Sequence, residues 1–331
     1  MCDSTKVQVV QMMNEVVMEL SRSSEPSLRY KINIHVFGKS PRSKIVTRTQ
    51  QEVRVSERVK ALLSGRDAQG RIPHHPEANW FGAHWVLESL ADQGYPPGDA
   101  SLEPLREQVH EWLFSEERRD EIQAVDGRAR VRASHEGNAL YYLLTLGLAD
   151  DRTDKLAERL MTWQWEDGGW NGDARPGIVD SSFSETLISL RGLALYNSVI
   201  GDIRARKSVN RAAELLFSRK LYKNESDGSP IEEGFVKLHY PRYSHYDVLF
   251  ALKVMTDAGF IEDERCEDAL DWLVSKKLPG GGFPADALFY TVSDQALVGS
   301  SRVDWGGAGP ELMNPFVTAD ALHVLREARR L

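Results

Sequence analysis

An apolar helical pattern recurs six times along this chain, and each copy follows a residue that suits the N-cap position of a helix. The caps are Ser or Asn, and these helices start near residues 27, 79, 134, 182, 244 and 314. The start at Asn314 is the clearest, because Pro315 occupies the first helical position, which proline favours. A repeat of about 50 to 70 residues is typical of a fold built from equivalent helical units.

Helices of a second kind lie between these starts, with one apolar stripe and one charged stripe, as expected at a protein surface. We expect them at 45–64, 101–115, 152–165, 207–222 and 263–277, with a sixth at 5–20. The helices of the first kind are apolar on more faces and should be buried. This alternation predicts an all-α fold, an (α/α)6 barrel (α/α toroid) of alternating inner and outer helices in a single domain over 1–331. An open helical solenoid is the structural alternative.

Charge and cysteine content restrict the partners of the chain. Its 331 residues carry a net charge of −8, which argues against nucleic acid as a partner. Cys2 and Cys266 are the two cysteines, which fits a reducing compartment and supplies no metal-binding motif. Neither a signal-peptide pattern nor an apolar run of about 18 residues is present. We therefore expect a cytoplasmic protein without membrane insertion, cofactor or metal, whose partner is a small-molecule substrate.

One motif carries a resemblance to known families. The run Gln164-Trp165-Glu166-Asp167-Gly168-Gly169-Trp170 resembles the QW-type repeat of squalene and hopene cyclases and of protein prenyltransferase β subunits. Weaker copies stand at 67–72 and 278–283, and the chain as a whole resembles bacterial squalene-cyclase-like and prenyltransferase-like proteins, most clearly at 80–85, 135–140 and 240–249. The resemblance implies the terpenoid-cyclase-like barrel. In this motif we expect Gly to end the outer helix and the aromatic residue to pack back on it.

The activities of those families do not carry over. Triterpene cyclases of the protonating class use an Asp-x-Asp-Asp motif, whereas the nearest run here, Val179-Asp180-Ser181-Ser182, holds a single Asp. Protein prenyltransferases hold zinc with an Asp, a Cys and a His, but Cys266 stands at the start of an outer helix, away from the expected cavity. The resemblance is thus informative for the fold and not for the reaction.

The long loops all precede inner helices, so we expect a site where the N-terminal ends of the inner helices converge and attract anions. The candidate catalytic residues are His84, His135, His245, Asp180, Glu185, Asp247 and Asp304. The candidate substrate-binding residues are Arg29, Trp80, Trp85, Arg132, Asn138, Trp170, Arg242, Tyr243, Tyr246, Arg302 and Trp305. Glu185 and Asp247 also stand at capping-box spacing, so helix capping is the alternative role for both. The aromatic residues have an alternative role in the core.

This mixture of groups suits an enzyme that performs acid/base proton transfer, namely cyclisation, isomerisation or elimination. Histidine moves protons near neutral pH, aromatic walls hold apolar groups, and arginine holds a carboxylate or phosphate. The substrate is then a small anionic amphiphile. A glycan-active hydrolase or lyase is a second hypothesis, which requires two carboxylates about 5–10 Å apart, with Asp180 or Glu185 opposite Asp304. A barrel that binds a ligand or a partner without catalysis is the third.

Overall fold

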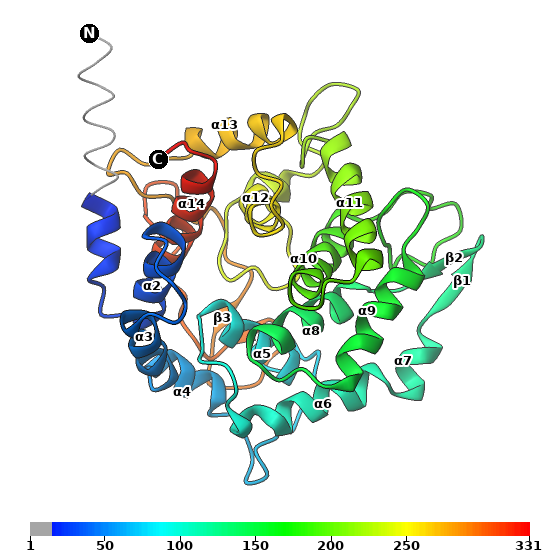
Figure 1. Ribbon diagram of the computed structural model, residues 1–331, viewed down its shortest axis with the longest axis horizontal. Helices are drawn as coiled ribbons and strands as arrows, with labels where there is room; N and C mark the ends of the chain where they lie inside the picture. Colours follow the sequence, from blue (N-terminus) through cyan, green and yellow to red (C-terminus); the bar gives the residue numbers. More distant parts are fainter. Residues whose placement is uncertain (1–14) are drawn as a thin grey trace.

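The computed structural model describes residues 15–331, and this part of the chain is predominantly helical, which confirms the all-α prediction (Figure 1). The buried helices are α2 (Pro26–Lys31), continued by η1 (Ile32–Val36), α5 (Ala83–Asp92), α8 (Ser134–Thr145), α10 (Phe183–Ile200), α12 (Val248–Asp257) and α14 (Pro315–Glu327). The surface helices are α3 (Lys44–Arg54), α4 (Glu57–Leu63), α6 (Glu103–Leu113), α7 (Glu116–Asp120), α9 (Asp151–Trp163), α11 (Ile203–Ser218) and α13 (Glu267–Ser275).

Short elements fill the connections between these helices. Three 3-10 turns are η2 (Ala100–Leu102), η3 (Glu233–Val236) and η4 (Glu264–Cys266). An antiparallel pair joins β1 (Gln123–Val125) to β2 (Arg128–Arg130), and a parallel pair joins β3 (Thr291–Val292) to β4 (Ser300–Ser301). Both pairs lie in the long segments that precede buried helices.

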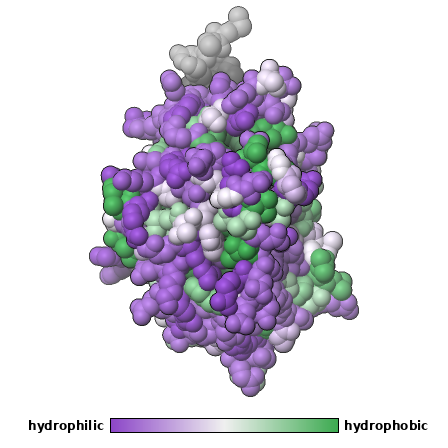
Figure 2. All heavy atoms as spheres, turned by 90° about the vertical axis from the view of Figure 1, so that its right-hand side faces the viewer, coloured by the Kyte–Doolittle hydropathy of each residue, from purple (hydrophilic) through white to green (hydrophobic). Residues whose placement is uncertain are grey.

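Buried and surface helices alternate along the chain as expected. Figure 1 shows the surface helices around the outside of the molecule and the buried ones within it. Consecutive buried helices from α5 to α14 contact one another in order, and α14 contacts α2 and η1. The face shown in Figure 2 is mostly hydrophilic with scattered hydrophobic residues. Within residues 15–331, no helix has the length and the apolar content needed to cross a membrane.

Two of the predicted helix starts are confirmed at the residue level. Ser182 caps α10 by accepting from Glu185 N, and Asn314 caps α14 by accepting from Phe316 N and Val317 N. The starts expected at 79 and 244 come later, at Ala83 and Val248. The second delay has a clear cause, because Asp247 rather than Ser244 caps α12.

The other predicted helices have mixed outcomes. α2 begins at Pro26 with Glu25 as its cap, and α8 begins at Ser134 itself. The expected helix 45–64 is divided into α3 and α4. Most of the expected helix 5–20 lies outside the described residues, although 15–21 is helical and buries Val16, Val17 and Leu20.

The motif at Gln164–Trp170 ends α9 in a different way from the one expected. Gln164 is itself the extended residue that stops the helix, and its amide nitrogen donates to Gly168 O and to Ser208 O of α11 at 2.7 and 2.9 Å. Gly168 follows later at φ +104°, where a Cβ atom would lie 2.4 Å from Arg211 O. Trp170 does pack back on α9, because its indole donates to Leu160 O at 2.9 Å. The motif therefore joins two surface helices.

Candidate functional site

The N-terminal ends of the buried helices, where the site was expected, hold packed aromatic side chains. Trp80 stacks on Tyr243 with ring centroids 4.3 Å apart, and Trp85 meets Trp80 edge to face at 4.8 Å. The two indoles donate to Phe289 O and Glu77 O, at 2.9 and 3.0 Å. These tryptophans are hydrogen-bonded core residues.

Other predicted aromatic residues have the same character. The Trp305 indole donates to Ser301 Oγ at 3.2 Å, and the Tyr246 hydroxyl donates to Leu221 O. Trp170 is fully buried between α9 and α10. Asn138 is also buried, on α8. Burial raises the pKa of Tyr243 and Tyr246 above the ordinary value, so both phenols stay neutral.

The three predicted histidines lie in two groups. His84 and His135 are neighbours, with ring centroids 5.7 Å apart. His84 Nδ1 is 3.1 Å from the Tyr142 hydroxyl, and burial lowers its pKa well below the ordinary value. His245 stacks on Phe289 elsewhere, and burial lowers its pKa to about 4. The lowered pKa values keep the imidazoles of His84 and His245 neutral at neutral pH.

The predicted acids do not converge on one point. Asp247 caps α12, with Oδ1 accepting from Phe250 N at 2.6 Å and Oδ2 lying 3.0 Å from His239 Nδ1. Glu185 accepts from Ser134 N at 2.7 Å, so it caps the neighbouring helix α8 rather than its own. Both acids bind helix N-termini, but neither returns the capping-box bond to its own cap that was the alternative.

Asp180 and Asp304 are exposed and lie beside different elements. Asp180 lines an open cavity of about 480 Å³ next to the start of α10. Asp304 accepts from Gly306 N at 2.8 Å, and its carbonyl oxygen accepts from Arg58 of α4. The pairing across a groove that a glycan-active enzyme needs is not supported by these contacts.

Three of the four predicted arginines are half-buried or exposed. Arg29 pairs with Glu52 of α3, Arg132 pairs with Glu77 at 2.9 Å, and Arg302 lies half-buried beside Gly65. Arg242 is different, because it is 5% exposed and reaches into the interior of the molecule.

Glu77 joins Arg132 and His135 in an ion-pair group whose strength depends on pH. Burial raises the pKa of Glu77, but the hydrogen bond and charge of His135 outweigh this and lower it to about 2. A lowered pKa contributes folding stability that is complete above the ordinary pKa near 4.5 and is lost as pH falls towards 2.

Glu77→Gln should lower the free energy of unfolding by about 1–2 kcal/mol at pH 7 and by less than half of that at pH 3, measured by urea denaturation. Glu57→Gln at an exposed site is the control, and an equal loss at both pH values would contradict the assignment.

A cluster of buried charged side chains occupies the centre of the molecule. Asp92, at the end of α5, accepts from Lys31 Nζ at 2.9 Å, from the Tyr240 hydroxyl at 2.7 Å and from Arg242. Lys253 Nζ donates to Asp92 at 3.2 Å and to Asp320 at 2.8 Å. Lys31 also donates to Asp320, at 3.0 Å. Two carboxylates are thus shared by three cations from separate helices and a loop.

The shared charges shift the pKa values within this central cluster. Burial raises the pKa of Asp92, but Arg242, Lys253 and Lys31 outweigh it and hold this pKa well below its usual range. Asp320 is lowered in the same way, chiefly by Lys253 and Lys31. Burial and the charge of Arg242 lower the pKa of Lys253 to about 8. Lys253 is therefore the cation of the cluster that titrates closest to neutral pH.

Two further charged residues extend the central cluster. Arg191 of α10 lies with its Cζ 3.3 Å from the ring centroid of Tyr141, and its Nη1 is 3.6 Å from Glu88 Oε1. Among residues 15–331, neither Nη1 nor Nη2 of Arg191 has a hydrogen-bond partner. Burial raises the pKa of Glu88. Four cations therefore face three carboxyl groups, of which one ionises less readily, and Asp257 in the adjoining cavity lining supplies a fourth carboxyl group.

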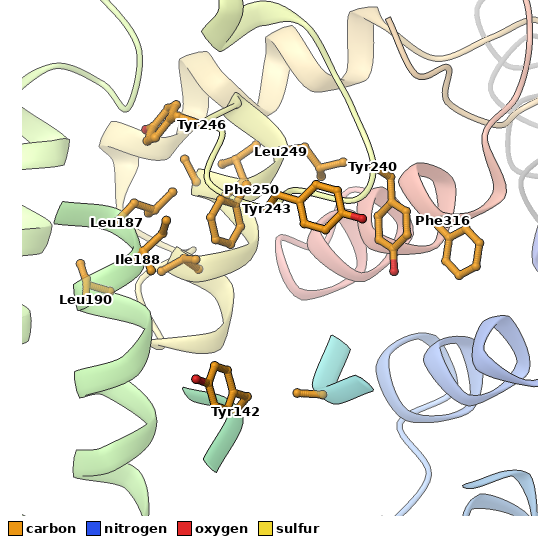
Figure 3. Packing of buried hydrophobic residues seen from close by; sticks show 14 of the residues in the cluster. Tyr142, Leu187, Ile188, Leu190, Tyr240, Tyr243, Tyr246, Leu249, Phe250 and Phe316 are labelled. Carbon is orange, nitrogen blue, oxygen red and sulfur yellow. The ribbon is translucent and has the colours of Figure 1, made fainter. Parts of the chain in front are cut away.

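A cavity of about 320 Å³ opens beside the central cluster. It lies towards the C-terminal ends of the buried helices, the end opposite to the one expected. Its polar lining comes from Tyr30, Lys31, His35, Asp92, Tyr141, Thr145, Arg191, Ser198, Lys253 and Asp257, and its apolar lining from Ala91, Ala194, Leu195 and Val254. Aromatic core residues also adjoin the central cluster, since Tyr240, whose hydroxyl donates to Asp92, stacks on Phe316 at 4.5 Å (Figure 3).

A group with metal-ligand spacing also occurs in the described part of the chain, at Glu107, His110 and Asp150. Arg152 donates to both oxygens of Glu107 at 2.7 and 2.8 Å and also pairs with Asp150. A guanidinium thus already neutralises the two carboxylates that a metal would need. These residues do not fit a metal site.

Of the predicted site residues, Arg242 alone belongs to the central cluster among the contacts of residues 15–331. Sequence reasoning missed Lys31, Glu88, Arg191 and Lys253, and it gave no role to Asp92. The missed signal was a single charged residue within an otherwise apolar helix, as in the run Val248-Leu249-Phe250-Ala251-Leu252-Lys253-Val254. Such residues are rarely buried unless they are paired or functional.

A scan of the chain against models of known protein families and a search of curated proteins gave no match.

Proposed function

We propose that the helices close into an (α/α)6 barrel of the terpenoid-cyclase-like class and that its central cavity binds a small anionic amphiphile for proton-transfer chemistry. The contact of α14 with α2 supports closure, because it joins the last buried helix to the first described one. The motif at 164–170 supports the class. A cytoplasmic location belongs to the same proposal, since Cys266 is a buried free thiol within the described residues.

Arg191 carries this proposal. A guanidinium offers five N–H donors, and burying them without partners costs free energy. Across residues 15–331, the two terminal nitrogens of Arg191 lack such partners, and the side chain lines the cavity. Stacking on Tyr141 holds the guanidinium plane in place. A ligand carboxylate or phosphate would accept these N–H groups and pair with the guanidinium charge.

The rest of the cavity suits an amphiphile and an acid–base reaction. Ala91, Ala194, Leu195 and Val254 give the ligand an apolar wall. Lys253, with its pKa near 8, can lose and regain a proton close to neutral pH, which general acid–base catalysis requires. Cyclisation, isomerisation and elimination all use such a group.

Arg191→Met tests the anion site, because among the described residues this arginine makes no hydrogen bond to the protein, and the variant loses only the longer ion pairs with Glu88 and Asp92. Phenylacetate and phenyl phosphate should raise the thermal midpoint of the native protein, whereas neutral phenylacetamide should not. The variant should bind the two anions about 10- to 100-fold more weakly. Calorimetric titration measures the affinities.

Arg206→Met, at an exposed position of α11, is the matched control for the loss of one positive charge. It should bind the anions as the native protein does. Equal weakening in both variants would show that net charge alone attracts the anions. If the anions did not shift the thermal midpoint of the native protein at all, the proposed function would be contradicted.

A further inference from the structure

We propose that Lys253 forms a covalent iminium ion with the carbonyl carbon of a small oxo acid bound in the central cavity. The inference rests on the proposed function, because the carboxylate of the oxo acid occupies the anion site at Arg191. It adds the substrate class and a nucleophile to that site.

The contacts of Lys253 suit an amine that reacts. Its Nζ donates to Asp320 Oδ1 at 2.8 Å and to Asp92 Oδ1 at 3.2 Å, and the side chain lines the cavity. When Nζ loses its third proton, the two remaining N–H groups still serve the two carboxylates. The nitrogen lone pair then has no proton and can attack a carbonyl carbon.

The other cations of the central cluster are less suited to this role. Arg191 and Arg242 keep their protons at all ordinary pH values. Lys31 also lines the cavity, but Asp320 and Asp92 raise its pKa against the effect of burial. Lys253 differs, since burial and Arg242 lower its pKa to about 8. At pH 7 about a tenth of Lys253 is the neutral amine, against less than a thousandth of an ordinary lysine. The geometry thus provides one nucleophilic amine and keeps the second lysine charged.

The reaction is balanced without any further reactant. The lone pair of Nζ forms a bond to the carbonyl carbon while the π electrons move to oxygen. The C–O bond then breaks, and the oxygen leaves as water with two of the three protons of the original ammonium group. Asp92 and Asp320, which already accept from Nζ, are placed to pass these protons on. The product keeps one N–H and one positive charge.

An iminium ion explains why an acid–base reaction would use this cavity. The positively charged nitrogen attracts the electron pair of a C–H bond on the adjacent carbon, so that carbon loses its proton more easily. Isomerisation or elimination next to the former carbonyl group then follows from the same covalent species.

Reductive trapping of the native protein tests the inference directly. Pyruvate or phenylpyruvate is added at pH 7 together with sodium cyanoborohydride, whose hydride converts an iminium ion to a stable secondary amine. We expect a mass increase equal to the oxo acid less one oxygen atom, and peptide mapping should place it on Lys253. Labelling of Lys253 should exceed that of exposed lysines by about 100-fold, in line with its larger neutral fraction.

Two variants and one independent measurement make the outcome decisive. Lys253→Arg should abolish the specific label, and Lys207→Arg, at an exposed position of α11, should keep it. Because the label is also mapped in the native protein, the result does not depend on how well a variant folds. Labelling confined to exposed lysines would overturn the inference. If only exposed lysines are labelled but anions still stabilise the native protein, the proposed function remains supported. If anions do not stabilise it either, both the proposed function and the inference about Lys253 are contradicted.

Discussion

Replacing Asp92 by asparagine should lower the free energy of unfolding by about 3–5 kcal/mol, the usual cost of leaving buried charges without their partner. Asp92 is 8% exposed and accepts from Lys31, Tyr240, Arg242 and Lys253. An amide can still accept hydrogen bonds, but it has no charge to set against three cations. Urea denaturation at pH 7.5 measures the loss.

A matched control shows how much of this loss arises because the ion pairs of Asp92 are buried. Asp271 pairs with Arg330 at 2.6 Å, but its side chain is 73% exposed. Asp271→Asn should therefore cost less than about 1 kcal/mol. Adding Lys31→Met to Asp92→Asn should restore part of the loss, since it removes one unpaired cation. If Asp92→Asn and Asp271→Asn lowered the free energy of unfolding equally, the buried ion pairs of the central cluster would contribute no more stability than an exposed ion pair.

Gly192→Ala should destabilise the protein by about 2–4 kcal/mol, although alanine is about 1 kcal/mol better than glycine in a helix. Gly192 of α10 faces Gly137 of α8 where these helices cross. A Cβ atom on Gly192 would lie 2.4 Å from Gly137 O, and one on Gly137 would lie 2.8 Å from Ile188 O. The obstacle is backbone, so no side chain can rotate away. The two helices would have to separate.

Gly234→Ala serves as the control for the crossing, because nothing lies within 4 Å of the position that its Cβ would take. Its stability should change by less than about 0.5 kcal/mol. Thermal and urea unfolding of both variants give the comparison. A Gly192→Ala protein as stable as the native one would mean that α8 and α10 can move apart at little cost.

Much of the fold could be predicted from local patterns. Apolar periodicity identified the two kinds of helix, and Ser182 and Asn314 identified two starts, because a cap and its first turn are neighbours in the chain. Ser244 failed as a cap because a second good cap, Asp247, follows three residues later. Asp247 also pairs with His239, eight residues earlier in the same loop, and a cap pattern read over three or four residues does not include that contact.

The candidate site was harder to predict for a physical reason. Histidine and tryptophan near helix starts look functional, but Trp80, Trp85 and His84 find hydrogen-bond partners in the packed core. The residues of the central cluster are single charges on separate helices. Asp92 and Lys253 are 161 residues apart, and only the folded chain shows that Lys253 donates a hydrogen bond to Asp92. Single charges in apolar helices were the available clue to this cluster.

The ion pair between Lys31 and Asp320 joins residues that are 289 positions apart in the chain, which has a consequence for folding during synthesis. While the chain grows, the early helices α2 and α5 supply Lys31 and Asp92, whereas Lys253 follows with α12 and Asp320 only with α14. A nascent chain that lacks α14 can bury this centre only with unmatched charge. Final consolidation is therefore tied to the arrival of the last helix, and partial chains meet an electrostatic barrier to premature closure.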